Sequence, residues 1–593
     1  MMWADFGWQG WLTLGTLVGV LILLISDRVS ADVACLGGLA LLLIAGVVDL
    51  EVGLSGFANE GVLTVAVLYV VAAGLFISGG LRLITGQLFS AVRGLRRGMV
   101  RLMIPTAMAS GVLNNTPIVA MLLPGTIQWA RENNIDPARL LIPLSYASIL
   151  GGTCTLIGTS TNLVVDGLLR SSGHPGFGFF AIAWVGIPTA IVGMLFLVIV
   201  GPYLLPKRSE EPAVFRAPDR YTTEVMVPPN SPHIGQPIGQ IALGKIDGLA
   251  PVAIARQGVL IPAPALDTRL VEGDHLIFSE PAAAVLKLHR FPDFSPAPRG
   301  LLIPPRIVEK SGRLVEVVLS QNCPLVGSVV GDGSFRRDYG AAVVAIARQG
   351  ERIVPNRMED WRLKAGDVLL LEAGESFDVS RLGRDAFVID EHREIDTKFN
   401  LRSLISVLFV IAMVGAAFLE VLSIFQAATA AAALMLLFKV ITPAEARDSL
   451  DWTVLLTIAA AFGIAGAMEQ TGVAASIAAT VVTFGAGPWI TLALFYLATS
   501  LLTESITNNA AAALMFPFAL TIAASLGVSP IPFAVAIMFA ASASFATPLG
   551  YQTNLMVYGA GNYRFRDFLK IGLPMNILVG STAVLLIPFF FPF

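Results

Sequence analysis

The sequence has little charge. Only 14% of its 593 residues are Asp, Glu, Lys or Arg, whereas 55% are hydrophobic, and the mean hydropathy is +0.74. This composition is too apolar for a cytosolic protein and predicts a membrane protein. The net charge of −3 offers no basic face, so nucleic acid is excluded as a partner.

Cysteine is also scarce. Cys35, Cys154 and Cys323 lie far apart, so they predict neither a disulfide framework nor a metal-ligand cluster. No Lys or Arg precedes Arg28, and the positive region of a secretory signal is therefore missing; the apolar stretch 11–25 is expected to be a retained membrane span. The sequence has no nucleophile–base or metal constellation, so we expect no enzymatic activity and no cofactor other than a coupling ion.

The few charges are concentrated in one block. Fifty of the 81 charged residues fall within 206–399, which leaves 31 for the other 399 positions. The chain therefore joins a polar block to two apolar parts, 1–205 and 400–593.

The apolar parts predict a polytopic α-helical membrane protein. A bilayer core of ~30 Å needs roughly 20 helical residues, and ten segments qualify: 11–26, 33–50, 62–80, 141–168, 181–204, 401–418, 424–440, 453–474, 533–559 and 571–591. Positive residues place one side of this arrangement inside: Arg93, Arg96, Arg97, Arg101, Lys207, Arg208, Arg564, Arg566 and Lys570. Five spans in each half then give an inverted repeat with a cytoplasmic polar block.

Two pairs of polar motifs recur between the halves. SGVLNNTPIVAMLLP from Ser110 matches TESITNNAAAALMFP from Thr503 at an offset of 393 residues, and TLIGTSTNLVVDG (155–167) matches TPLGYQTNLMVYG (547–559) at an offset of 392. The first pair lies in apolar segments interrupted by Asn, Thr and Pro, which predict two re-entrant hairpins. The second pair is expected to break the helices that face them.

These motifs carry amides and hydroxyls at the expected mid-depth of the bilayer, where unsatisfied polar groups are costly. None contains Lys, Arg or His, so an anion would be held by neutral donors and by helix N-termini. Hydroxyls at Ser110 and Thr503 could complete two related sodium sites, since hard cations prefer oxygen ligands. Asp166 and Glu504 could relay protons, although a structural role is favoured. The substrate-binding residues are expected to be Asn114, Asn115, Thr116, Thr159, Ser160, Thr161, Asn162, Thr507, Asn508, Asn509, Gln552, Thr553 and Asn554.

The hairpin motifs resemble those of the divalent anion/sodium symporter family, whose hairpin tips read Ser-Asn-Thr. Here the tips read Asn-Asn-Thr and Thr-Asn-Asn, so that only the central Asn115 and Asn508 are kept. LNNTPIVAMLLP and LSYASILGGTCTLIGTSTNLVV are most similar to the sulfate-transporter branch. By this resemblance Ser110, Asn114, Asn115 and Gly158 form one sodium site, and Thr503, Asn508 and Gly550 form the other. The resemblance also implies a homodimer in the cell inner membrane and an elevator mechanism, in which a rigid transport domain moves against a fixed scaffold.

The polar block contains a direct repeat. VAIARQG occurs at 252–258 and at 344–350, and RLVEGD (269–274) matches RLKAGD (362–367). Short alternating runs bounded by Gly, Pro and Asp predict two tandem α+β domains, 206–298 and 299–399. The repeats resemble the TrkA C-terminal domain, also called RCK-C, of potassium channel regulators. No GxGxxG occurs in the block, so an NAD switch is not expected, and a nucleotide effector at these domains stays open.

The resulting hypothesis is a secondary transporter that imports a divalent oxyanion, sulfate first, with sodium. Other oxyanions, dicarboxylates and proton coupling remain alternatives. A channel gated by the cytoplasmic domains is an alternative of another class, but the sequence has no TVGYG-like filter.

Overall fold

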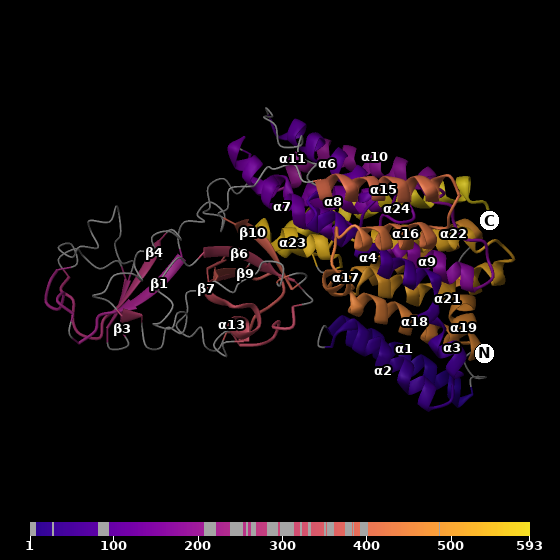
Figure 1. The fold of residues 1–593 in the computed structure, drawn as a ribbon. Coiled ribbons are helices and arrows are strands. Elements are labelled where there is room, and N and C mark those ends of the chain that lie inside the picture. Colours follow the sequence, from indigo (N-terminus) through magenta and orange to yellow (C-terminus); the bar gives the residue numbers. More distant parts are fainter. Residues whose placement is uncertain are drawn as a thin grey trace. The chain divides into compact units, whose positions relative to one another are not determined.

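The computed structural model divides into a helical unit and a sheet unit (Figure 1). The helical unit comprises Met1–Pro206, Asp396–Asn554 and Phe565–Phe593, and the sheet unit comprises Lys207–Ile395 and Leu555–Arg564. The structure describes residues 7–26, 29–80, 94–133, 135–206, 221–229, 231–237, 253–256, 259–262, 268–280, 295–296, 313–320, 323–329, 334–348, 351–352, 361–373, 382, 385–391, 401–484, 487–548 and 550–593. Arg93, Lys207 and Arg208, which helped to orient the predicted spans, lie outside the described residues.

The described helices of the two halves follow one another in the same order. In the first half they are α1 (Trp8–Ser26), α2 (Ala31–Ile44), α3 (Leu50–Leu54), η1 (Ser55–Ala58), α4 (Glu60–Ile77), α6 (Leu95–Ser110), α7 (Asn115–Glu132), η2 (Pro137–Arg139), α8 (Leu141–Gly152), α9 (Ser160–Ser171), α10 (Ala183–Ile199) and α11 (Gly201–Leu204). In the second half they are α15 (Leu401–Phe418), α16 (Ile424–Leu437), α17 (Pro443–Asp448), α18 (Trp452–Gln470), α19 (Val473–Phe484), α20 (Pro488–Thr503), α21 (Asn508–Leu526), α22 (Ile531–Ser542), α23 (Gln552–Ala560) and α24 (Phe565–Phe590).

The matched helices keep the spacing of the sequence repeat. The first residues of α1 and α15, of α2 and α16, of α6 and α20, and of α7 and α21 are each 393 residues apart, and those of α4 and α18 are 392 apart. The repeat therefore extends well beyond the polar motifs. It covers helices whose sequences show no obvious similarity.

The two halves interlock. α2 packs on α18, and its counterpart α16 packs on α4; α1 lies against α2 as α15 lies against α16. Each half thus contributes a helix, α2 or α16, that packs against a helix of the other half. This exchange makes the helical unit a single body rather than two linked domains.

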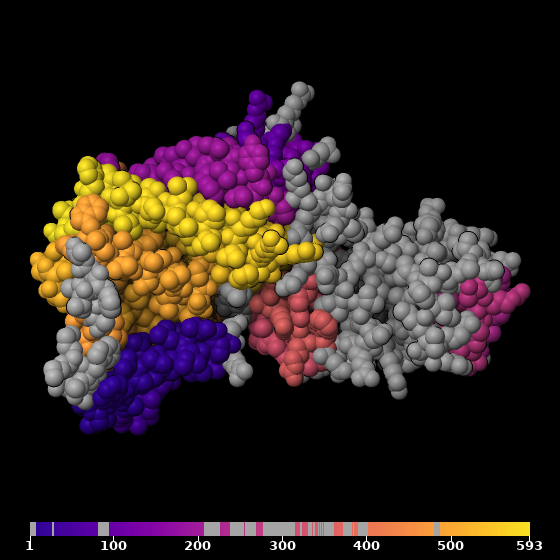
Figure 2. All heavy atoms as spheres, turned by 180° about the vertical axis from the view of Figure 1, so that it is seen from behind, coloured from indigo at the N-terminus to yellow at the C-terminus, as the bar shows by residue number. Residues whose placement is uncertain are grey.

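Apolar side chains cover much of the outside of the helical unit. On α10, Trp184, Ile187, Ile191, Leu195 and Ile199 are all exposed by 48% or more, and their spacing places them on one helix face. α10 lies beside α24 on the face that Figure 2 shows. Large exposed apolar surfaces of this kind are typical of lipid contact.

Among the described residues, six helices are long and apolar enough to cross a membrane: α1, 50–77 (which includes α4), α15, α18, α21 and α24. α2, α10, α16, α20 and α22 are shorter apolar helices. This pattern is that of a polytopic membrane protein.

Two of the ten expected spans are wrong as continuous helices. Residues 141–168 fall into α8 and α9, with a turn from 153 to 159, and residues 533–559 fall into α22 and α23, interrupted from 543 to 551. The second pair of polar motifs predicted these breaks, whereas hydropathy averaged over each segment concealed them, because Thr, Gly and Asn lie between strongly apolar flanks. α19 was not expected at all, and α21 is apolar enough to span by itself.

In the described part of the sheet unit there are two five-stranded antiparallel sheets. The first consists of β1 (Tyr221–Met226), β2 (Ala253–Arg256), β3 (Val259–Pro262), β4 (His275–Glu280) and β5 (Ser295–Pro296). The second consists of β6 (Arg313–Leu319), β7 (Ala341–Arg348), β8 (Glu351–Arg352), β9 (Val368–Ala373) and β10 (Ala386–Glu391), with α13 (Ser334–Tyr339) before β7. The strand order is β3-β2-β4-β1-β5 in the first sheet and, read from the opposite edge, β8-β7-β9-β6-β10 in the second. The order is therefore the same.

The repeated sequence motifs explain turns that the two sheets share. Asp274 accepts a hydrogen bond from the backbone N–H of Val271, and Asp367 accepts the corresponding bond from Lys364, each at 2.8 Å. In the second sheet, the guanidinium of Arg348, from the VAIARQG motif, also donates two hydrogen bonds to the carboxylate of Asp367, at 2.6 and 2.7 Å. The Gly-Asp pair thus closes the turn before β9, and the Arg fixes it to β7.

Removal of Asp367 should destabilise the second sheet. Its side chain is 1% exposed and Arg348 is 24% exposed, so Asp367→Ala leaves a partly buried guanidinium without its partner. We expect a loss of about 3 kcal/mol. In hydrogen–deuterium exchange of the purified protein, the amides of β6 and β9 should then exchange roughly a hundredfold faster. Lys364→Ala, at an exposed position of the same turn, is the control. Equal exchange in the two variants would show that the ion pair contributes nothing.

Candidate functional site

Two helical hairpins and two interrupted helices carry the polar motifs of the sequence. α6 turns into α7, and α20 turns into α21; α8 is separated from α9, and α22 from α23. These four places are named the first tip (110–116), the second tip (503–509), the first break (153–162) and the second break (543–554).

Four helices begin at the tips and breaks: α7, α9, α21 and α23. Asn114, Thr159 and Thr507 precede the first three, and within the described part of the chain their side chains make no capping hydrogen bond to the helix that follows. Backbone N–H groups at such helix ends lack intrahelical partners and carry the positive end of the helix dipole. A group of helix starts is therefore an environment that favours an anion.

Each tip bonds to the break of the other half. Thr116 in the first tip donates to Gln552 in the second break at 3.1 Å. In the matched arrangement, Ser160 in the first break donates to Asn509 in the second tip at 2.9 Å. Asn509 matches Thr116 and Gln552 matches Ser160 in the sequence repeat. The two contacts therefore join equivalent positions of the repeat, and together they bring all four motifs into contact.

Tyr551 lies where the motifs meet. Its hydroxyl accepts a hydrogen bond from the amide of Asn115 and lies 3.0 Å from the hydroxyl of Thr159; Asn508 is a further hydrogen-bond partner. Asn115 in turn accepts a bond from the hydroxyl of Ser110. The central amides of both tips are thus joined through one phenol group, which is 6% exposed.

The first break is held by its own polar side chains. Thr155 donates to the carbonyl of Gly111 and accepts from the N–H of Gly158. Asn162 donates to the carbonyls of Gly152 and Thr155, at 3.3 and 2.9 Å. Backbone groups released by the interruption of the helix are satisfied in this way, as a buried backbone requires.

The second break repeats these bonds. Thr547 donates to the carbonyl of Glu504 at 3.2 Å and accepts from the N–H of Gly550 at 3.3 Å. Asn554 donates to the carbonyls of Ser544 and Thr547, at 2.7 and 3.3 Å. Asn554 also accepts a bond from Ser145 at 2.7 Å. By contrast, the buried amide oxygen of its counterpart Asn162 has no hydrogen-bond partner among the described residues.

Oxygen atoms crowd around one glycine in each break. A methyl group on Gly158 would lie 2.6 Å from the carbonyl oxygen of Gly152 and 2.8 Å from that of Ser110. A methyl group on Gly550 would lie 2.1 Å from the hydroxyl oxygen of Ser544 and 2.7 Å from the carbonyl oxygen of Thr503. Only a residue without a side chain fits at either place, and carbonyl and hydroxyl oxygens are what Na⁺ prefers.

Glu504 makes the two halves unequal, because Gly111 stands at the matched position of the first tip. Its carboxylate accepts bonds from the N–H groups of Ala546 (3.0 Å) and Thr547 (2.9 Å), from the hydroxyls of Thr547 (2.7 Å) and Ser544 (3.1 Å), and from the amide of Asn576 (2.7 Å). All five donors are neutral. Glu504 is therefore a connector between α20, the second break and α24. Asp166, the other acid considered, pairs with Arg170 at 2.8 Å.

The remaining predicted residues differ in their surroundings. Thr161 and Thr553 are fully buried. Thr161 lies 3.5 Å from the amide oxygen of Asn509, and the hydroxyl of Thr553 lies 2.9 Å from that of Ser145. Thr507 is exposed. The structure thus gathers the predicted set around the tips and breaks. Their roles as substrate or sodium ligands stay predictions.

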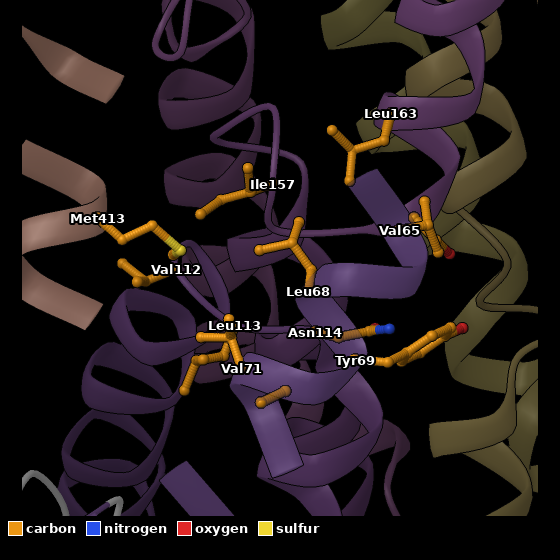
Figure 3. Close-up of a pocket in the computed structure, with 12 residues that line it drawn as sticks. Val65, Leu68, Tyr69, Val71, Val112, Leu113, Asn114, Ile157, Leu163 and Met413 are labelled. Carbon is orange, nitrogen blue, oxygen red and sulfur yellow. The ribbon is translucent and has the colours of Figure 1, made fainter. Parts of the chain in front are cut away.

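A cavity opens beside Asn114 and Ser160 (Figure 3). Its other walls come from α4, the first tip, the first break, α9 and Met413 of α15, and they are almost entirely apolar, as Leu68, Val112 and Ile157 illustrate. The cavity therefore lies between the first tip, α4 and α15, and its lining is apolar apart from Tyr69, Asn114 and Ser160.

Reasoning from the sequence missed Tyr551, Ser145, Ser544 and Asn576 as parts of this site, whereas it singled out Glu504 and favoured a structural role for it. Tyr551 and Glu504 stand inside the repeated motifs, where their departure from the repeat was the available signal. Ser145 and Asn576 lie on neighbouring helices, and no sequence pattern connects them to the motifs.

Comparison with known proteins gives a consistent set of matches. The sequence profile described as a citrate transporter matches residues 21–527 and 507–593. A Chlamydomonas reinhardtii protein named for the sulfur deprivation response is 34% identical over 578 residues, which cover 95% of this chain and 98% of that protein. An uncharacterised transporter of Synechocystis is 33% identical over 593 residues, with 97% and 96% covered. Sodium/sulfate cotransporter 2 of Chlamydomonas reinhardtii is 29% identical over 782 aligned residues, with 96% and 88% covered.

Loss of the Glu504 carboxylate should weaken the helical unit. Glu504→Ala leaves four donors without an acceptor, because the Thr547 hydroxyl can still donate to the backbone carbonyl of residue 504. Each unsatisfied group costs about 1–3 kcal/mol. The apparent unfolding temperature of the purified protein should fall by several degrees, and Glu504→Gln, which keeps one acceptor oxygen, should fall less. Glu132→Ala, at an exposed position on α7, serves as the control. An unfolding temperature of Glu504→Ala equal to that of the control would contradict the connecting role.

Proposed function

Because this chain belongs to the citrate transporter family, we propose that it is a secondary transporter that imports a divalent oxyanion, sulfate first, together with sodium. The family match and the sodium/sulfate cotransporter relatives confirm in part the expected resemblance, at the level of an anion transporter with several membrane-spanning helices. The choice of sulfate, the coupling ion and the mechanism are proposals.

One observation carries the substrate proposal: helix starts from both halves converge where Tyr551 joins Asn115 and Thr159. The four motifs there contain hydroxyls, amides and backbone N–H groups but no Lys, Arg or His. Neutral donors and helix dipoles can bind a dianion while still permitting its release, which a carrier requires.

Sodium coupling is supported by the oxygen atoms around Gly158 and Gly550. Each group combines a carbonyl oxygen of a tip with a further oxygen, that of Gly152 at the end of α8 in one half and that of Ser544 in the second break in the other. Two bound sodium ions would offset the charge of a dianion, and proton coupling is the alternative. Three relatives are named sodium/sulfate cotransporters.

An elevator movement is supported by the uneven distribution of polar contacts. Tips and breaks are tied to one another by hydrogen bonds across the repeat, such as Thr116–Gln552 and Ser160–Asn509, so they would move as one body. Apart from Tyr69, the wall toward α4 and α15 is apolar at the cavity, and apolar contacts can be exchanged during sliding without loss of hydrogen bonds. We further propose that the protein is a homodimer in the cell inner membrane. The two sheets are proposed to be cytoplasmic TrkA-C-like domains that dimerise or regulate the transporter, and they are the proposed place for a nucleotide effector. The relatives are transporters, and on this reading the chain catalyses no reaction.

Dicarboxylate transport by the same site is the main alternative, because the matching profile is named for citrate. A ligand-gated channel remains the alternative from another class. Counterflow separates carrier from channel, since unlabelled substrate on the far side accelerates uptake only by a carrier.

The central amides of the tips should be indispensable. In proteoliposomes, Asn115→Ala or Asn508→Ala should abolish sodium-stimulated sulfate uptake, because each removes an amide that bonds Tyr551 and a donor at the site. Asn133→Ala, at the far end of α7, is the control. The unfolding temperature of each variant verifies folding. Undiminished uptake by both folded tip variants would refute the site assignment.

The two glycines should determine the response to sodium. Gly158→Ala or Gly550→Ala places a methyl group among the proposed sodium ligands. We expect the sodium concentration for half-maximal uptake to rise by at least about tenfold, the effect of roughly 1.4 kcal/mol. Gly415→Ala on α15, where a methyl group meets no atom within 4 Å, is the control. An unchanged sodium dependence in both folded variants would argue for another driving ion or another site.

A further inference from the structure

We propose that Tyr551 limits the size of the anion that the site accepts, and that it restricts the site to compact tetrahedral oxyanions. This inference rests on the proposed function and adds to it a residue that selects among substrate classes.

The position of Tyr551 in the repeat carries the first step. Tyr551 matches Thr159 at the offset of 392 that pairs Gly550 with Gly158 and Asn554 with Asn162. The two matched hydroxyls lie 3.0 Å apart, so equivalent points of the two halves face each other. One half reaches this point with the short side chain of a threonine, whereas the other reaches it with a complete phenol ring.

The ring is held in place from several sides. Tyr551 is 6% exposed, Thr159 is 1% exposed and Asn115 is fully buried. Its hydroxyl is bonded by Asn115 and Asn508 of opposite tips and lies against Thr159. Rotation of the ring out of this place would break these bonds together. The ring of Tyr551 is therefore held in a fixed position. It fills the space that a threonine at position 551 would leave open.

The shapes of the candidate anions explain why the ring of Tyr551 would favour tetrahedral oxyanions over dicarboxylates. A tetrahedral oxyanion presents acceptor oxygens in every direction within one small sphere, so donors can surround it without a long cavity. A dicarboxylate or citrate needs a second anion-binding place several ångströms away, and the ring stands between the two tips. A hydroxyl also has one proton to donate, and Tyr551 can turn that proton to an oxyanion that enters beside it.

The test compares competitors of different length against radiolabelled sulfate uptake in proteoliposomes. For the wild-type protein, unlabelled sulfate and thiosulfate should inhibit well, whereas malonate, succinate and citrate should inhibit at least about tenfold less. Succinate that inhibits the wild-type protein as strongly as sulfate would overturn the proposal without any variant.

Three substitutions separate the ring from its hydroxyl. Tyr551→Thr, which copies the first half, and Tyr551→Leu, which shortens the side chain, should each make succinate a better inhibitor by about tenfold or more relative to sulfate. Tyr551→Phe keeps the ring but loses the hydroxyl, so it should weaken the binding of sulfate without making succinate a better inhibitor. Tyr203→Thr, which alters a tyrosine that is 74% exposed, should leave the competitor order unchanged. A folded Tyr551→Thr or Tyr551→Leu protein with the wild-type competitor order would overturn the proposal.

A separate measurement distinguishes this inference from the proposed function. Thermal stabilisation of the same purified proteins by sulfate and by succinate reports binding without transport. If the wild-type protein takes up no sulfate with sodium, the proposed function fails; if it does, but shortening Tyr551 does not improve stabilisation by succinate, only the size limit fails.

Discussion

Backbone that leaves a helix in an apolar surrounding must find partners for its N–H and C=O groups, and the rest of this structure depends on that requirement. The chain meets it twice with the same residues. A threonine bridges tip and break, and an asparagine bonds two carbonyls of the interrupted helix: Thr155 with Asn162, and Thr547 with Asn554. Because these side chains satisfy the interruptions, the helix starts and the glycine-centred oxygen groups can remain open to ligands. The polar interior thus consists of two matching sets of tip and break, which satisfy the interrupted backbone in the same way and lie opposite each other.

The departures from symmetry are as informative as the repeat. Glu504 replaces a glycine and gathers five neutral donors, so that α20, the second break and α24 are joined where the first half relies on a single threonine bond. Tyr551 replaces a threonine and reaches into the shared centre. The second half therefore carries the additional carboxyl group and the larger side chain, while the first half carries Asn162, whose amide oxygen has no partner among the described residues. A transporter with two matched halves can in this way bind an asymmetric set of ions.

Much of the arrangement could be predicted from the sequence because the motifs repeat in order at offsets of 392 and 393 residues. Those offsets reappear in the starts of α1 and α15, and of α7 and α21. The segments 141–168 and 533–559 are each interrupted; the second pair of polar motifs predicted a break there, whereas hydropathy averaged over 20 residues does not register a short polar turn between apolar flanks. The repeat in the polar block predicted turns that recur in both sheets, since Asp274 and Asp367 each accept a backbone bond inside the repeated motif.

The sequence by itself determined which residues are unusual: uncharged polar motifs in an apolar chain, each present twice. It could do so because burial of amides and hydroxyls in lipid is costly enough to mark them. Only the tertiary structure decided which of them meet, since Thr116 and Gln552 are 436 residues apart along the chain and no local pattern encodes that contact. It also assigned Tyr551, Ser145 and Asn576 to the site. Those side chains become partners only when helices of the two halves pack together, because a hydrogen bond depends on positions in space and not on spacing along the chain.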